Sequence, residues 1–216
     1  MDETFPSKEN TMKPACLSIL VILFCSIAAA HAADSKVELK NISLEWKPTD
    51  QVRSFDAIDL TAFVDMPFVI KPFNDVRKKP QEIGKNVERR GTNQDLLVTT
   101  KDNVASWLTD RFAQVLTEFG IDVVKKEGSF VLEADIIKFY VTEGSTYRGD
   151  VGLKVRLRSA KNDAILWEGM VSTSSSRWGS SYKAENYFES LSDATISAVY
   201  ALLQDETFRQ AVRKNR

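Results

Sequence analysis

Cysteine and histidine, the side chains most often used as nucleophiles, general bases and zinc ligands, occur only in the first 32 residues of this chain. Cys16, Cys25 and His31 all lie there, in a segment that resembles an export signal. Removal of that segment leaves a protein without thiol or imidazole. We therefore expect no catalytic residue, no metal site and no cofactor, and a protein that is not an enzyme.

Carboxyl groups are the remaining candidates for acid–base chemistry. Glu133 and Asp135 alternate with apolar residues, so they share one face of an expected strand, about 6–7 Å apart. Lys154, Arg156 and Arg158 share one face of the next strand. Cross-strand ion pairs account for both sets. A hydrolytic carboxyl pair and an anionic ligand are the alternatives, although no G-x-S-x-G, P-loop or G-x-G-x-x-G motif is present.

The beginning of the chain has the order of features typical of a signal peptide. Lys13 supplies a positive charge, residues 15–30 form a short apolar core, and an A-x-A site ends at Ala32. We expect cleavage between Ala32 and Ala33. The apolar core is shorter than the roughly 20 residues that span a bilayer, which argues against an uncleaved anchor.

The start and the lipidation of the chain are left open by its sequence. The polar, partly acidic residues before Met12 are unusual for a signal peptide, so either Met1 or Met12 is the start. Phe24 is too bulky for the small residue that lipoprotein processing requires before a modified Cys25. We expect an exported protein of the bacterial periplasm, with lipidation at Cys25 and association with the outer membrane as alternatives.

Composition indicates an ordinary globular protein: 43% of the residues are hydrophobic and 27% are charged. A formal net charge of −1 gives no long-range attraction to nucleic acid or to anionic lipid. We expect a signal peptide at 1–32, an N-terminal extension at 33–60 and a single α/β domain at 61–216. The expected partner is an envelope protein or a second copy, with the membrane contacted only peripherally.

Apolar stripes of helical period indicate where the helices lie. They predict long helices at 101–119 and 183–204 and a short helix at 205–214. Thr100 or Asp102 is expected to cap the first of them.

Strands are indicated by alternation. The apolar residues 61–73 predict a strand that is interrupted by prolines, and the charged residues 74–95 predict a long loop. Residues 130–137, 151–158 and 165–172 alternate as expected for an antiparallel meander. The resulting fold class is α+β, a mostly antiparallel sheet of four to six strands with two main helices packed on one face.

A serine-rich polar tract, residues 172–181, precedes the second long helix. Such a tract has little apolar surface to bury. It contains Arg177 and Trp178, and a large aromatic residue in a polar loop either marks a contact surface or packs back on the domain. Arg177, Trp178 and Tyr182 are therefore our candidate interaction residues.

Four short motifs carry a family resemblance. They are FVIKPFNDVR at 68–77 with its Asp75-x-Arg77 element, Ile83-Gly84, Leu97-Val98-Thr99 and Phe119-Gly120-Ile121. Over about residues 60–204 the chain resembles the YajG-like family of bacterial envelope lipoproteins. The resemblance implies an α/β fold with two helices behind a sheet, related to the auxiliary lipoproteins of ABC-type transporters and to the amino-terminal domain of TolB. It also implies an envelope accessory role with no established enzymatic activity.

The resemblance leaves two points open. The family's lipidation cysteine is not matched, because Phe24 precedes Cys25. Asp75 and Arg77 either pair with each other, cap the loop or bind a ligand.

These observations predict a non-catalytic periplasmic or outer-membrane-associated accessory protein, which binds a protein partner or self-assembles in the cell envelope. The alternative is a periplasmic carrier or auxiliary subunit of a transport system. A carrier would hold a lipid or another apolar ligand between the helices and the sheet.

Overall fold

The computed structural model describes residues 39–49, 58–88 and 95–215, all of which belong to the unit Val37–Arg216. The expected signal peptide, its cleavage site at Ala32 and Ala33, and the candidate lipidation site Cys25 lie outside the described residues and stay predictions.

Three α-helices, one 3₁₀ helix and eight strands make up the described part of the chain. In chain order they are η2 (Thr61–Phe63), β1 (Phe68–Ile70), β2 (Asn74–Asp75), β3 (Glu82–Asn86), β4 (Leu96–Thr99), α1 (Val104–Glu118), β5 (Val123–Val124), β6 (Phe130–Glu143), β7 (Tyr147–Ser159), β8 (Ile165–Arg177), α2 (Ala184–Gln204) and α3 (Glu206–Lys214).

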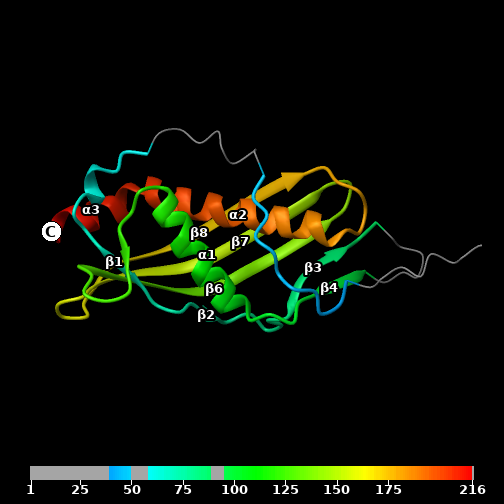
Figure 1. Ribbon diagram of the computed structural model, residues 1–216, viewed down its shortest axis with the longest axis horizontal. Helices are drawn as coiled ribbons and strands as arrows, with labels where there is room; N and C mark the ends of the chain where they lie inside the picture. The colour runs from blue at the N-terminus through cyan, green and yellow to red at the C-terminus, as the bar shows by residue number, and fades with distance from the viewer. Residues whose placement is uncertain (1–38, 50–57, 89–94, 216) are drawn as a thin grey trace, which may run out of the picture. The chain divides into compact units, whose positions relative to one another are not determined.

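Strand β6 organises the sheet, because three short strands lie along one of its edges and one long strand lies along the other (Figure 1). The strands β1, β2 and β3 pair with it in succession, each parallel, whereas β7 pairs with it antiparallel along nearly its whole length. β8 is antiparallel to β7, β4 is antiparallel to β3, and β5 is parallel to β1. The α+β class is confirmed. The predicted four to six mostly antiparallel strands are corrected to a mixed sheet of eight.

Proline spacing explains why three short strands replace one longer strand. β1 ends two residues before Pro72, and Pro80 precedes β3. A proline cannot donate a hydrogen bond to the neighbouring strand, so pairing with β6 stops and starts again. The expected loop at 74–95 is therefore wrong in part, because it contains β2 and β3. Its strand pattern is weak, since Ile83 is the only large apolar residue in β3.

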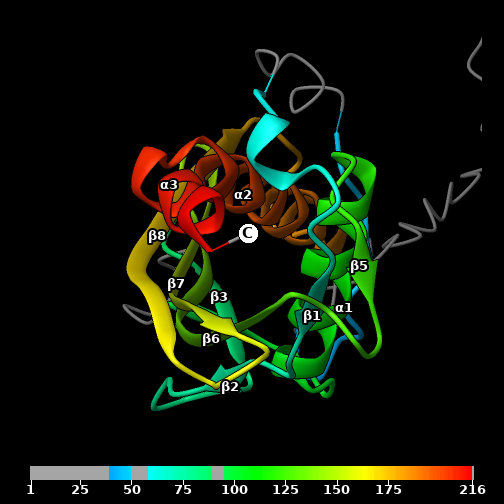
Figure 2. The same ribbon diagram turned by 90° about the vertical axis from the view of Figure 1, so that its left-hand side faces the viewer.

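The long helices α1 and α2 pack against each other and lie in front of the sheet in Figure 1. α2 contacts β6, β7 and β8, α1 contacts β2 and β5, and α3 adds a third helix that packs against η2 and β8 (Figure 2). Two main helices on one face are thus as predicted. Their contact with the sheet forms the core, which contains Leu108, Phe112, Tyr187, Leu191 and Leu202.

The cap of α1 differs from the prediction. Asn103 is the N-cap residue, and its side chain accepts a hydrogen bond from the Ser106 backbone N–H at 2.9 Å. Thr100 and Asp102 instead hold the segment 39–49: the Thr100 hydroxyl donates to the Ile42 carbonyl, and Asp102 accepts from the Leu44 N–H. Both predicted caps are therefore used for long-range contacts.

Segment 39–49 is also held by α2. The Thr49 N–H and hydroxyl donate to the two carboxyl oxygens of Asp193 at 2.8 and 2.6 Å, and the Lys47 N–H donates to the Ser192 hydroxyl at 3.0 Å. This part of the expected N-terminal extension packs directly against the helices.

The serine-rich tract is largely a strand. β8 continues to Arg177, so residues 172–177 are not the loop that composition suggested. The hydroxyls of Thr173 and Ser175 face the helix and donate to the carbonyls of Ala194 and Ser190 in α2, at 2.9 and 2.7 Å. Small hydroxyl side chains are suited to this place because they let the helix backbone approach the sheet.

Gly149 on β7 makes the same close approach possible. A Cβ atom at this position would lie 2.5 Å from the Ser190 carbonyl oxygen, a backbone atom that cannot rotate away. We expect Gly149→Ala to lower the free energy of unfolding by about 2 kcal/mol, as overpacking does, in urea denaturation followed by circular dichroism. Gly144→Ala is the matched control, since its nearest neighbour lies 3.7 Å from the new Cβ. Equal stability of the two variants would contradict this account.

Candidate functional site

The connection from β8 to α2, residues 178–183, presents the most exposed large apolar side chain of the described residues. Trp178 is 75% exposed. Tyr182, four residues further along the chain, is 9% exposed and has a left-handed backbone conformation with φ of 55°. The structure therefore places the two aromatic candidates differently, Trp178 in solvent and Tyr182 in the core.

Glu143, at the end of β6, holds this connection from within. Its side chain is buried, and its Oε1 atom accepts hydrogen bonds from the Tyr182 N–H at 2.7 Å and the Ser181 hydroxyl at 3.0 Å. Its Oε2 atom accepts from the Tyr187 hydroxyl of α2 at 2.6 Å. No lysine or arginine of the described residues forms an ion pair with it. Neutral donors thus satisfy this carboxyl group.

A second set of hydrogen bonds converges on Ser180. Its carbonyl oxygen accepts from the Tyr147 hydroxyl and from the Asn186 side-chain amide, each at 2.7 Å. The Asn186 amide lies so close to Gly179 that a Cβ there would be 2.5 Å from it. The residues next to Trp178 are therefore fixed by the protein interior while the indole ring projects outward.

The two tyrosines of this network remain protonated at physiological pH. Burial raises the pKa of Tyr187, and its hydrogen bond to Glu143 and the charge of that group raise the pKa further. Burial also raises the pKa of Tyr147. The two rings meet edge to face with their centroids 5.3 Å apart. Because both phenols stay protonated, each donates a hydrogen bond, Tyr147 to the Ser180 carbonyl and Tyr187 to Glu143.

Arg177 is the last residue of β8 rather than part of a loop. Its guanidinium forms an ion pair with Glu189 of α2, and its Nε donates to the Trp178 carbonyl oxygen at 3.3 Å. Its charge is already balanced within the protein, so Trp178 is the member of the predicted set that is available for contact.

Asp75 and Arg77, which carry the family resemblance, form a buried clasp beside β6. Arg77 donates to both oxygens of Asp75, at 2.8 Å from Nε and 2.6 Å from Nη2. It also donates to the carbonyl oxygens of Pro80, Glu82 and Phe139, at 2.6, 3.0 and 2.8 Å. All five N–H donors of the guanidinium are therefore used, and they join β2, β3 and β6.

The predicted carboxyl pair lies in a set of cross-strand ion pairs. Arg158 lies 3.4 Å from Glu133, and Arg156 pairs with both Asp135 and Glu168. The basic residues of β7 thus meet acidic residues on both neighbouring strands, which accounts for the basic stripe seen in the sequence.

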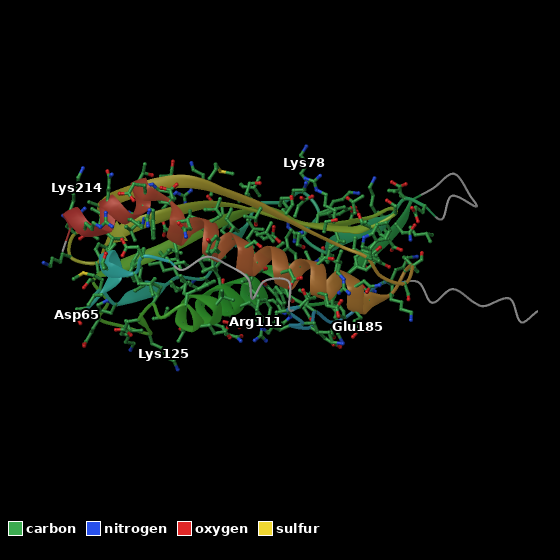
Figure 3. The ribbon with its side chains drawn as sticks, turned by 90° about the horizontal axis from the view of Figure 1, so that it is seen from above. Asp65, Lys78, Arg111, Lys125, Glu185 and Lys214 are labelled. Carbon is green, nitrogen blue, oxygen red and sulfur yellow. The ribbon has the colours of Figure 1, made fainter. Side chains whose placement is uncertain are left out.

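The clasp is next to a shallow hollow. It has a volume of about 240 Å³ and is lined by residues 77–79, Glu82 and residues 137–140. Lys78 projects away from the ribbon there (Figure 3). This hollow is not in the space between helices and sheet where a carrier would hold its ligand.

The described residues show neither a membrane-spanning helix nor a cluster of metal ligands. None of their helices combines the length and apolarity that crossing a bilayer requires. They also contain no group of three or more His, Cys, Asp or Glu placed to hold a metal ion.

Comparison with known proteins gives structural neighbours only. No protein-family model and no curated protein sequence matches the chain. A DUF330 protein from Xanthomonas campestris has 10% identity and a TM-score of 0.49, with 76% of this chain and 91% of that chain covered. A PelC dodecamer from Paraburkholderia phytofirmans has 16% identity and a TM-score of 0.37, with coverages of 66% and 88%. Lipoprotein GNA1162 from Neisseria meningitidis has 13% identity and a TM-score of 0.31, with coverages of 54% and 88%.

These neighbours include a DUF330 protein and a bacterial lipoprotein, and the finer YajG-like resemblance stays a prediction. At such identities and TM-scores, the likenesses assign no family, activity or partner to this chain.

Sequence reasoning missed Glu143 and Tyr187. Glu143 directly follows the polar Thr142, and the alternation of β6 changes phase before it, so the pattern alone does not place it inside. One signal was present: Tyr187 falls on the apolar stripe of α2, where a buried hydroxyl needs a partner.

Proposed function

We propose that this chain is a non-catalytic accessory protein of the bacterial cell envelope, which acts by binding another protein through the surface around Trp178. The expected signal peptide supports export. The observation that carries the binding role is the 75% exposure of Trp178 on a connection fixed by Glu143, Tyr147 and Asn186.

A fixed, exposed tryptophan is suited to recognition. Ordering of side chains and loops at an interface makes the free energy of binding less favourable, and a surface that is already ordered in the free protein reduces this cost. Tryptophan is also among the residues most enriched at the energetic centres of protein interfaces.

The charged residues support a role without chemistry. Arg77 and Asp75 join three strands, Glu143 holds a loop, and Glu133 and Asp135 are paired with arginines. Each of these groups has a structural use that accounts for its position.

We expect Trp178→Ala to weaken capture of an envelope partner by at least about tenfold in affinity, without changing the thermal midpoint of unfolding. Capture from an envelope extract should compare the wild type with Trp178→Ala and with Val76→Ala. Val76 is the matched control, since it is 49% exposed and directly follows β2. Loss of binding in both variants, or in neither, argues against the proposal, and a lowered melting temperature for Trp178→Ala alone would place the indole in the core.

A further inference from the structure

Strand β8 forms a free edge of the sheet (Figure 2). Within the described residues it pairs with β7 and with no other strand. It is 13 residues long, so its outer side presents a row of backbone N–H and C=O groups that a further strand could bind.

This edge lacks the features by which proteins usually block strand addition. Residues 169–176 (GMVSTSSS) contain no proline and no charged side chain. The irregularity in the pairing of β7 with β8 lies between Leu157 and Arg158, which face the beginning of β8. The stretch from Gly169 to Ser176 is therefore regular and uncharged.

The two most exposed large apolar side chains of the described residues lie near the two ends of this stretch. Met170 is 61% exposed within β8, and Trp178 is 75% exposed one residue beyond its end. They are eight residues apart, an even number, so a strand that continued to Trp178 would carry both on the same face.

We propose that β8 pairs antiparallel with β8 of a second copy, about a twofold axis at Ser174. In this register Met170 of each copy lies opposite Trp178 of the other, so two exposed apolar pairs are covered at once. Other antiparallel registers separate these residues. The inference rests on the proposed function and names a second copy as one protein that the surface binds.

The register is also compatible in charge. Glu168 lies beyond the paired stretch, because β8 ends at Arg177, and Arg177 lies opposite Val171, so no two like charges meet. Ser172 of one copy lies opposite Ser176 of the other, and the two Ser174 residues lie opposite each other. Small side chains therefore occupy the centre of the pairing, where the backbone hydrogen bonds between the copies form.

Site-specific crosslinking tests this geometry. The full chain, with Cys16 and Cys25 replaced by serine, would carry Ser174→Cys as its sole thiol. Directly opposite Cβ atoms in an antiparallel pair are about 4.5–5.5 Å apart, so mild oxidation should join the two copies. Ser172→Cys and Ser176→Cys are matched controls on the same strand face. Each thiol would be offset from its own counterpart by four residues, roughly 13 Å, and should not crosslink.

Sedimentation of the unmodified protein provides the second measurement. We expect a concentration-dependent dimer whose dissociation constant rises at least about tenfold in Trp178→Ala and in Met170→Ser. Circular dichroism of each variant establishes that the fold is retained.

The outcomes separate this inference from the proposed function. The pairing is overturned if the protein stays monomeric, or if the Ser172→Cys or Ser176→Cys variant crosslinks as readily as the Ser174→Cys variant. Capture of a different envelope protein that depends on Trp178 would then still support the proposed function. A dimer that crosslinks in the Ser174→Cys variant, with no other captured protein, supports the pairing alone.

Discussion

Replacing Arg77 with leucine is expected to lower the free energy of unfolding by about 3–5 kcal/mol, which is the usual cost of removing one partner of a buried ion pair. The guanidinium satisfies Asp75, whose side chain is only 11% exposed, and three backbone carbonyls. Leucine removes every one of these side-chain donors, so that of this set only the backbone N–H of residue 77 still donates to Asp75. Urea denaturation followed by circular dichroism measures the loss.

Arg77→Lys distinguishes geometry from charge. Lysine keeps the positive charge but has three donors at one point instead of five in a planar fork. It can pair with Asp75 but cannot also reach the carbonyls of Pro80, Glu82 and Phe139. We expect it to recover less than half of the stability that leucine loses.

Lys78→Leu is the matched control for the leucine variant. Lys78 is the next residue in the chain, is exposed and projects outward (Figure 3). Surface substitutions of this kind change stability by about 0.5 kcal/mol or less. If Arg77→Leu and Lys78→Leu are equally stable, the clasp does not hold β2, β3 and β6 together.

Replacing Glu143 with alanine is expected to lower the free energy of unfolding by about 3 kcal/mol, since two donors of buried residues and the hydroxyl of the exposed Ser181 then lose this acceptor. The Tyr182 N–H, the Ser181 hydroxyl and the Tyr187 hydroxyl have hydrogen bonds of 2.7, 3.0 and 2.6 Å to this side chain. Thermal and urea unfolding measure the effect. Hydrogen exchange of residues 178–183 should also become faster, because the connection loses its internal support.

Glu143→Gln and Glu133→Ala are the controls. Glutamine keeps an acceptor toward Tyr182 and Ser181, and the Tyr187 hydroxyl can rotate to accept from its amide, so we expect a loss of only about 1 kcal/mol. Glu133 has the same residue type on the same strand but faces the outer side, where its loss should cost less than about 1 kcal/mol. A Glu143→Ala variant as stable as Glu133→Ala would refute the anchoring role.

The helices were predictable because their signal is local and long. α1 buries one stripe and α2 buries most of its surface, but in both helices apolar residues recur at helical spacing over several turns. That spacing is visible in the sequence without knowledge of the partner surface. Their caps were less predictable. Thr100 and Asp102 are good capping residues, but their long-range bonds to Ile42 and Leu44 leave Asn103 as the cap.

The short strands could not be predicted from the sequence alone. β2 has two residues, and β3 has one large apolar residue, so neither forms an alternation long enough to detect. They are strands because β6 supplies a partner edge for them. The same holds for residues 172–177. Their serine-rich composition is typical of a loop, and only the contacts of Thr173 and Ser175 with α2 explain why they form a strand.

The candidate site was predicted in part. For Trp178, the sequence predicted either an exposed contact residue or a side chain packed on the domain, and the first is observed. For Asp75 and Arg77, it predicted an ion pair, a loop cap or a ligand site, and the ion pair is observed. The buried network of Glu143 was not predicted, because its members come from β6, the connection and α2. Such a cluster depends on tertiary contacts that no single stretch of sequence encodes.

One irregularity in β6 has a consequence for how relatives of this chain should be sought. The pairing with β7 shifts between Ile136 and Lys138, so the inward positions change from even numbers, such as Ile136, to odd numbers, such as Phe139. Ile137 is the inserted residue and is 47% exposed. A relative whose strand lacks the inserted residue aligns with both halves of β6 only if a one-residue gap is placed at Ile137. Without that gap, the inward positions after Ile137, Glu143 among them, are matched to outward ones.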